Sequence, residues 1–234
     1  MSAENLPPIH DTCRLWQRGE DETLHACTRY RRTQAAGWSL SFLRDAAPRI
    51  LTGEVPETAL WRAVRTNVPE EGRDSVWRGV KLLFDFVRRH HWRGVELPPR
   101  DVPVGHGFTV RISPIGVFSS DLMKGKWLLA IQPRLDDVPT LEQFRIWHSA
   151  LHYEFCCDPL DPFEALIVDL SRNQVSGQRR LRQLSTEQLP LLEKKELDDR
   201  FDLVATCFKR SIELVPQLSI KPRRATDTGQ GELF

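Results

Sequence analysis

Residues 126–170 carry the clearest structural pattern in this chain of 234 residues. Residues 126–132 read KWLLAIQ, residues 141–155 read LEQFRIWHSALHYEF, and residues 163–170 read FEALIVDL. The first and third segments are apolar runs of strand length, as in strands that are covered on both faces. The middle segment follows Pro139-Thr140 and has a helical pattern. A strand, a helix and a second strand predict a crossover unit within a mixed β-sheet.

Further patterns extend this unit in both directions. Apolar residues recur at three- and four-residue steps from Asp74 to Trp92, and shorter helices are expected at Leu40–Leu51 and Glu57–Thr66. Phe108–Phe118 is rich in β-branched and aromatic residues and predicts strand. Leu189–Leu214 carries another helical pattern before Pro216.

We therefore predict an α+β fold with N-terminal helices, a mixed β-sheet with a crossover helix in the middle, a C-terminal helix and a flexible tail. Pro7-Pro8 and isolated charges leave the first twenty residues without periodicity. The expected divisions are a weakly ordered N-terminus (1–20), a helical region (21–96), a mixed α/β region with the C-terminal helix (97–220) and a flexible tail (221–234).

The composition is that of a globular protein. Hydrophobic residues make up 40% and charged residues 28%, and the formal net charge is +1. This balance argues against a chain held on nucleic acid by bulk electrostatics alone. No apolar run approaches the roughly 18 residues of a membrane span, and residues 1–8 lack the blocks of a signal peptide. The five cysteines include no C-x-x-C pair, so we expect a reduced, cytoplasmic protein without metal or another cofactor.

The clearest functional signal is the pentapeptide Gln230-Gly231-Glu232-Leu233-Phe234. Apolar side chains after a polar segment gain nothing from exposure to water. Leu233 and Phe234 suit an apolar pocket of a partner, and Gln230 suits hydrogen bonds at its rim. The pentapeptide resembles the short linear motif by which bacterial proteins bind the replicative DNA sliding clamp: Gln, often Leu, Ser or Asp, Leu and Phe. It departs from that pattern at the second and third positions, and an inert tail is the alternative interpretation.

Two internal segments also match the clamp peptide. Gln217-Leu218-Ser219-Ile220 is the poorer match. The better one keeps the second-position leucine, and its clamp-binding candidates are Gln188, Leu189, Leu191 and Leu192. A structural interpretation of this segment is favoured, with Ser185 or Thr186 capping a helix, Pro190 in its first turn and the leucines facing the core. The terminal peptide is therefore the preferred docking site.

The resemblance implies the DNA polymerase III β sliding clamp as partner, with indirect contact with the DNA that the clamp encircles. The chain shows no recognisable catalytic centre. It is similar to clamp-binding toxins of toxin–antitoxin systems, which compete with replication proteins and inhibit DNA replication elongation. That similarity implies a non-catalytic protein, an adaptor antitoxin and degradation by the ClpXP protease.

Other residues favour an alternative, a divergent or degenerate nuclease or a DNA-repair accessory tethered to the clamp. Asp121, Gln132 and Arg134 invite comparison with the PD-(D/E)XK nucleases, which place an Asp at one strand end and Glu-x-Lys on the next strand to hold Mg²⁺. Gln132 is neutral, however, and Arg134 replaces the lysine. Three residues at four-residue spacing are also considered as a helical metal site, and partly buried helix histidines or a polar face are the favoured interpretation: His148, His152 and Cys156.

The sequence has three local basic clusters. One interpretation is that they contact DNA or an acidic partner, and the alternative is that they are solvated surface charge. The balanced acidic total favours solvated charge. The clusters are Arg29, Arg31 and Arg32; the segment Arg172–Arg182; and Lys221, Arg223 and Arg224.

Overall fold

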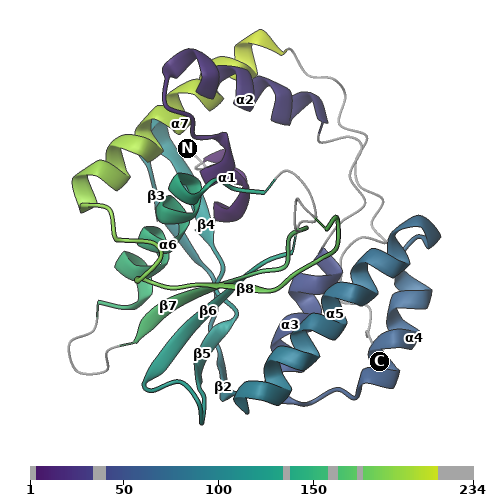
Figure 1. Ribbon diagram of the computed structural model, residues 1–234. Helices are drawn as coiled ribbons and strands as arrows, with labels where there is room; N and C mark the ends of the chain where they lie inside the picture. Colours follow the sequence, from purple (N-terminus) through teal and green to yellow (C-terminus); the bar gives the residue numbers. More distant parts are fainter. Residues whose placement is uncertain (1–3, 34–40, 134–137, 158–162, 173–175, 216–234) are drawn as a thin grey trace.

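The computed structural model describes residues 4–33, 41–133, 138–157, 163–172 and 176–215 (Figure 1). At its centre lies a five-stranded mixed sheet with the order β2-β5-β6-β7-β8. Strands β6 and β7 are parallel and are connected through helix α6 (Leu141–Phe155), whereas the other neighbouring pairs are antiparallel. The strands are β2 (Arg93–Glu96), β5 (Gly116–Ser119), β6 (Lys126–Gln132), β7 (Glu164–Asp169) and β8 (Arg182–Leu184).

The expected crossover unit is confirmed. Leu128 and Leu129 of β6 point to opposite faces of the sheet, and both are fully buried. Helix α6 begins with a reciprocal capping box, in which Thr140 Oγ1 accepts from the Gln143 amide and the Gln143 side chain accepts from the Thr140 amide. The apolar runs and the cap together fix the strand, helix and strand of this unit.

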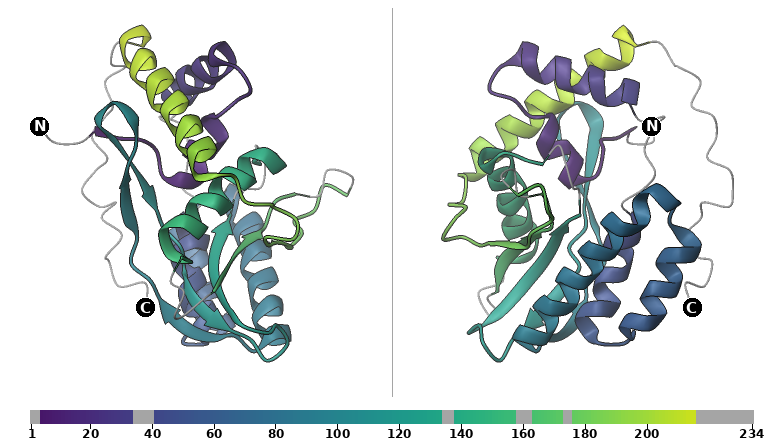
Figure 2. Two further views of the ribbon diagram at one scale, coloured as in Figure 1. Left: turned by 90° about the vertical axis from the view of Figure 1, so that its left-hand side faces the viewer. Right: turned by 45° about the vertical axis from the view of Figure 1, so that its right-hand side comes forward.

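Helices cover both faces of the sheet (Figures 1 and 2). On one face, α3 (Ser41–Thr52), α4 (Glu57–Asn67) and α5 (Glu70–His90) bury a cluster that includes Leu129. On the other face, α6 and α1 (Ile9–Leu15) form a second cluster. The alternation of apolar residues in β6 and β7 supplies both clusters, so the sheet is a shared middle layer.

A smaller sheet lies beside this second face and has the order β1-β4-β3. Its strands are β1 (Glu4–Asn5), β4 (Phe108–Ile112) and β3 (Arg100–Pro103), and a 3-10 turn at Gly105–Gly107 precedes β4. Phe108 packs in a third cluster with residues of α2 (Glu20–Thr33) and α7 (Lys194–Leu214).

Several boundaries differ from the sequence prediction. The expectation of a weakly ordered N-terminus is wrong for residues 4–15, because Ile9, Cys13 and Leu15 are buried and hold α1 against the body. Helix α5 begins at Glu70, directly after Pro69, and α7 begins at Lys194 rather than Leu189. Strand β2 lies within the region expected to be helical, and the expected tail 221–234 lies outside the described residues. None of the helices in the described ranges combines the length and low polarity of a membrane-spanning segment.

Candidate functional site

The preferred docking residues Gln230, Leu233 and Phe234 lie outside the described residues, as does the poorer match Gln217–Ile220. The described chain ends at Val215, which is buried, directly after α7. The internal match, Gln188–Leu192, is described in full. Its geometry decides whether this segment has groups to offer a partner.

The internal match lies in a turn and an extended connection rather than in the first turn of a helix. The Gln188 side-chain oxygen accepts hydrogen bonds from the Ser185 amide at 3.0 Å and from Ser185 Oγ at 2.8 Å. The amides of Gln188 and Leu189 both donate to the Ser185 carbonyl, at 3.1 and 2.9 Å. The side chain that would bind the rim of a clamp pocket is therefore engaged in its own turn.

The leucines of this segment belong to the core. Leu189 is fully buried and Leu192 is 1% exposed, and both lie in the cluster that contains Phe144 and Trp147 of α6. Leu191 is half-buried. Withdrawing a fully buried leucine into water costs about 1.5–3 kcal/mol, so this segment is held in place by its own apolar side chains.

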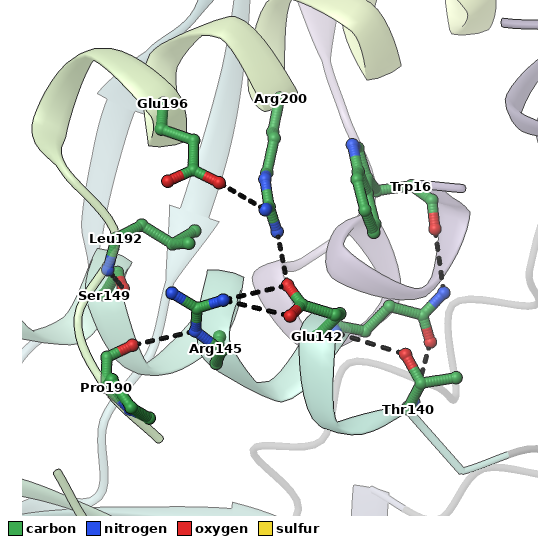
Figure 3. Close-up of polar contacts among 10 residues, drawn as sticks. Trp16, Thr140, Glu142, Arg145, Ser149, Pro190, Leu192, Glu196 and Arg200 are labelled. Atoms are coloured by element: carbon green, nitrogen blue, oxygen red, sulfur yellow. Dashed lines mark hydrogen bonds and ion pairs between the residues drawn. The ribbon is translucent and has the colours of Figure 1, made fainter. Parts of the chain in front are cut away.

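The backbone of the segment is bound to α6 as well (Figure 3). The Leu192 amide donates to the buried Ser149 Oγ at 2.9 Å, and Tyr153 Oη donates to the Leu192 carbonyl at 2.7 Å. Arg145 Nε donates to the Pro190 carbonyl at 2.9 Å. A clamp pocket would have to replace all of these bonds, so the internal match is a structural connection between β8 and α7.

A charged network beside this connection joins α6, α7 and the segment after α1 (Figure 3). Glu142 accepts hydrogen bonds from Arg145 at 2.9 Å and from Arg200 at 3.1 Å. Burial alone would raise the pKa of Glu142, but the hydrogen bonds from Arg200 and Arg145 outweigh it and hold that pKa below its usual value. The Arg200 guanidinium also lies over the Trp16 ring, 4.4 Å from its centroid. The network holds the start of α7 against α6 and against the segment after α1.

Two of the residues that suggested the nuclease comparison, Asp121 and Gln132, lie toward opposite ends of β6. Ser119 pairs with Lys126 at the turn between β5 and β6, so Asp121 lies beyond the start of β6. Gln132 is the last residue of the same strand. Six residues of strand separate the two ends by about 20 Å. Asp121 and Gln132 therefore lie too far apart to bind one metal ion, and Arg134 lies outside the described residues.

His148 is a core residue, whereas the sequence favoured a partly buried or polar helix position. It is fully buried, and its Nε2 lies 3.1 Å from the Ala165 carbonyl of β7, so the Nε2 proton is donated to that oxygen. Burial lowers the pKa of His148 to about 4 and raises that of the Cys156 thiol to about 12. Among the described residues, no group of three or more His, Cys, Asp or Glu side chains is placed to hold a metal ion.

Sequence reasoning missed a polar cluster at the carboxyl ends of β6 and β7. The strand register places Gln132 beside Asp169, and both are fully buried. Asp169 accepts hydrogen bonds from the amide and hydroxyl of Ser171 and from Arg182 Nε at 2.8 Å. The signal was available, because the apolar run of β7 ends in Asp169 and an arginine-rich segment follows it. No protein-family model matches this chain, and no curated protein or solved structure matches it.

Proposed function

We propose that this chain binds the bacterial DNA polymerase III β sliding clamp through the peptide Gln230–Phe234. The observation that carries the proposal is the contrast between the two better matches. In the internal match, the glutamine side chain, buried leucines and the backbone are engaged in contacts within the protein itself. The terminal match keeps the glutamine, leucine and phenylalanine of the pattern that it resembles.

The energetics of such a peptide limit its affinity. Burial of Leu233 and Phe234 contributes about 1.5–3 kcal/mol for each side chain. Ordering a five-residue peptide costs several kcal/mol of backbone entropy, so hydrogen bonds from Gln230 and the main chain must supplement the apolar pair. We expect the isolated peptide to bind no more tightly than about 1 μM, which corresponds to about −8 kcal/mol.

The length of chain after α7 is sufficient for docking at a distance from the body. Residues 216–229 separate the end of the described chain from Gln230. Fully extended, these fourteen residues span at most about 50 Å. The peptide therefore reaches a clamp pocket without any displacement of α7.

The expected consequence is competition. A clamp pocket that holds Leu233 and Phe234 is closed to the peptides of polymerases and other replication proteins, so an abundant competitor stops replication elongation. This mode of action is the one implied by similarity to the toxin SocB. It carries with it the proposals of an adaptor antitoxin, SocA, and of degradation by the ClpXP protease.

The proposal is tested by measuring the affinity of the full chain for purified sliding clamp. We expect Leu233→Ala/Phe234→Ala to lower that affinity at least tenfold and to abolish competition with a fluorescent polymerase peptide. The matched comparison is Gln230→Ala against Gln188→Ala, because both glutamines begin a match but only Gln188 is engaged in its own turn. Unchanged affinity in the double variant would refute the proposal.

A second candidate function is a divergent nuclease or repair accessory tethered to the clamp. In the PD-(D/E)XK nucleases a helix and another strand follow the two strands that carry the acidic residues, and the order β5, β6, α6 and β7 resembles that arrangement. Asp169 is the carboxylate that the register places beside Gln132. Mg²⁺-dependent cleavage of plasmid DNA that disappears in Asp169→Asn, while the variant keeps its thermal stability, would favour this function over competition.

A further inference from the structure

Strands β7 and β8 continue beyond their ends as a two-stranded ribbon. Their register pairs Asp169 with Arg182, and the isolated bridge between Arg172 and Arg179 continues the same register. Between these pairs, the Arg180 amide donates to the Ser171 carbonyl at 2.9 Å. We call residues 170–172 and 176–182 the arginine ribbon. The left view of Figure 2 shows the described parts of the connection between β7 and β8, residues 170–172 and 176–181, projecting from the body.

The sequence around the ribbon has an unusual charge composition. Residues 170–186 read LSRNQVSGQRRLRQLST and contain four arginines with neither Asp nor Glu. In the whole chain, 33 basic residues face 32 acidic ones. The remaining polar residues of the segment carry amide and hydroxyl groups. Guanidinium, amide and hydroxyl groups without carboxylates are the side chains that proteins direct at nucleic-acid backbones.

Two of the four arginines fix the base of the ribbon. Arg179 is 9% exposed, and its Nη1 donates to the carbonyls of Pro133 and Leu170 at 2.9 and 2.8 Å. Its Nε and Nη2 also lie within hydrogen-bond distance of Ser75 Oγ on α5, at 3.3 and 3.1 Å. Arg182 is bound to the buried Asp169. These contacts tie the ribbon to the ends of β6 and β7 and to α5, so its orientation is set before any ligand arrives.

The other two arginines, Arg172 and Arg180, are exposed. Arg172 lies opposite Arg179 in the ribbon, and Arg180 is the neighbour of Arg179, so the two exposed residues lie on opposite faces of the ribbon. Gln178 is exposed between them. An arginine fork binds two phosphate oxygens at once, which makes exposed arginines on a fixed ribbon well suited to a row of phosphates.

We propose that the arginine ribbon binds duplex DNA, with Arg172 and Arg180 on the phosphates of the two backbones that border the major groove. That groove is about 12 Å wide and accepts a two-stranded β-ribbon. An acidic protein surface or an anionic membrane offers negative charge without such a groove. This surface lies on the described body and is separate from the peptide Gln230–Phe234, so the two proposals succeed or fail independently.

The experiment is a fluorescence-anisotropy titration of a labelled 20-base-pair duplex with the full chain at several salt concentrations between 50 and 200 mM. Arg172→Ala/Arg180→Ala is expected to weaken binding about tenfold at the lowest salt concentration. It should also reduce the slope of log K against log[salt] by about 1.8, because two phosphate contacts are lost. The matched control is Lys194→Ala/Lys195→Ala, which removes two exposed cations from α7 and is expected to leave both quantities unchanged.

The outcomes separate the possible partners. Equal loss in the ribbon variant and the α7 control would show a general charge effect and overturn the proposal. Binding to vesicles of anionic lipid with no binding to the duplex would also overturn it. Deletion of Gln230–Phe234 should leave the DNA titration unchanged, so failure of clamp binding is distinguishable from failure of the ribbon. Because Arg172 and Arg180 are exposed, their double variant is expected to keep the thermal stability of the parent chain.

Discussion

Leu189→Ala is the substitution that separates a core role from a docking role for the internal match. Leu189 is fully buried in the cluster formed with Phe144 and Trp147. A Leu→Ala change at such a site removes the transfer free energy of the side chain and leaves a cavity, at a cost of about 2–5 kcal/mol. For a chain of this size, each kcal/mol lowers Tm by about 2–4 °C, so we expect Tm to fall by about 4–20 °C.

The assay combines thermal and urea unfolding, followed by circular dichroism, with a clamp-binding titration below the unfolding range. The matched control is Leu191→Ala, because Leu191 is only half-buried in the same connection and should cost about 1 kcal/mol or less. Clamp affinity should not change in either variant. A loss of stability under about 1 kcal/mol for Leu189→Ala, together with weaker clamp binding, would refute the placement of this leucine in the core.

Three further predictions concern titration and the ribbon base. Burial lowers the pKa of His148 from 6.5 to about 4. Between about pH 6.5 and pH 4 the unfolded chain therefore binds a proton that the folded chain does not. Unfolding titrations should show the free energy of unfolding falling by up to about 3 kcal/mol as the pH drops through this range. The pKa of Glu142 is also lowered, so its ion pairs stabilise the fold above the ordinary carboxyl pKa and are lost on acidification. Glu142→Gln should flatten the stability profile below about pH 4.5 by at most about 1 kcal/mol. Arg179→Ala should cost about 2–4 kcal/mol in urea unfolding, because it leaves the carbonyls of Pro133 and Leu170 without this donor; a change within 0.5 kcal/mol would contradict its bracing role.

The crossover unit could be predicted because local and long-range requirements agree there. The apolar runs of β6 and β7 are buried on both faces, and α6 carries its own cap, so periodicity and capping point to one structure. The mixed sheet follows from the helix that must connect two parallel strands.

The short edge strands could not be predicted in the same way. All four residues of β2 are exposed, so no alternation of buried residues marks them, and β8 has only three residues. Their strand conformation comes from hydrogen bonds to partner strands. Strand β2 pairs with β5, and β8 pairs with β7, and neither pairing is visible in the residue pattern of the edge strand itself. Helix α1 has seven residues and depends on contacts with α6 and β4 rather than on its own periodicity.

The candidate sites show the same difference between local sequence patterns and contacts that are distant in sequence. The likeness of Gln188–Leu192 to a docking peptide is a local property, whereas its burial depends on Ser149 and Tyr153 in another helix. The distance between Asp121 and Gln132 is set by the direction of the β5–β6 hairpin, which residue spacing alone does not give. The internal contacts of Arg179 likewise involve residues up to 104 positions away.

The packing of α2 against α7 has a consequence for folding during synthesis on the ribosome. Cys27 and Cys207 are fully buried in the cluster that these helices share, and the Cys207 thiol donates to the Glu20 carbonyl across 187 positions of sequence. At about 5–20 residues per second, the ribosome needs on the order of 10–40 seconds to make the intervening chain. During that interval the apolar face of α2 is not covered by α7, and chaperones and proteases have their best opportunity to bind the nascent chain.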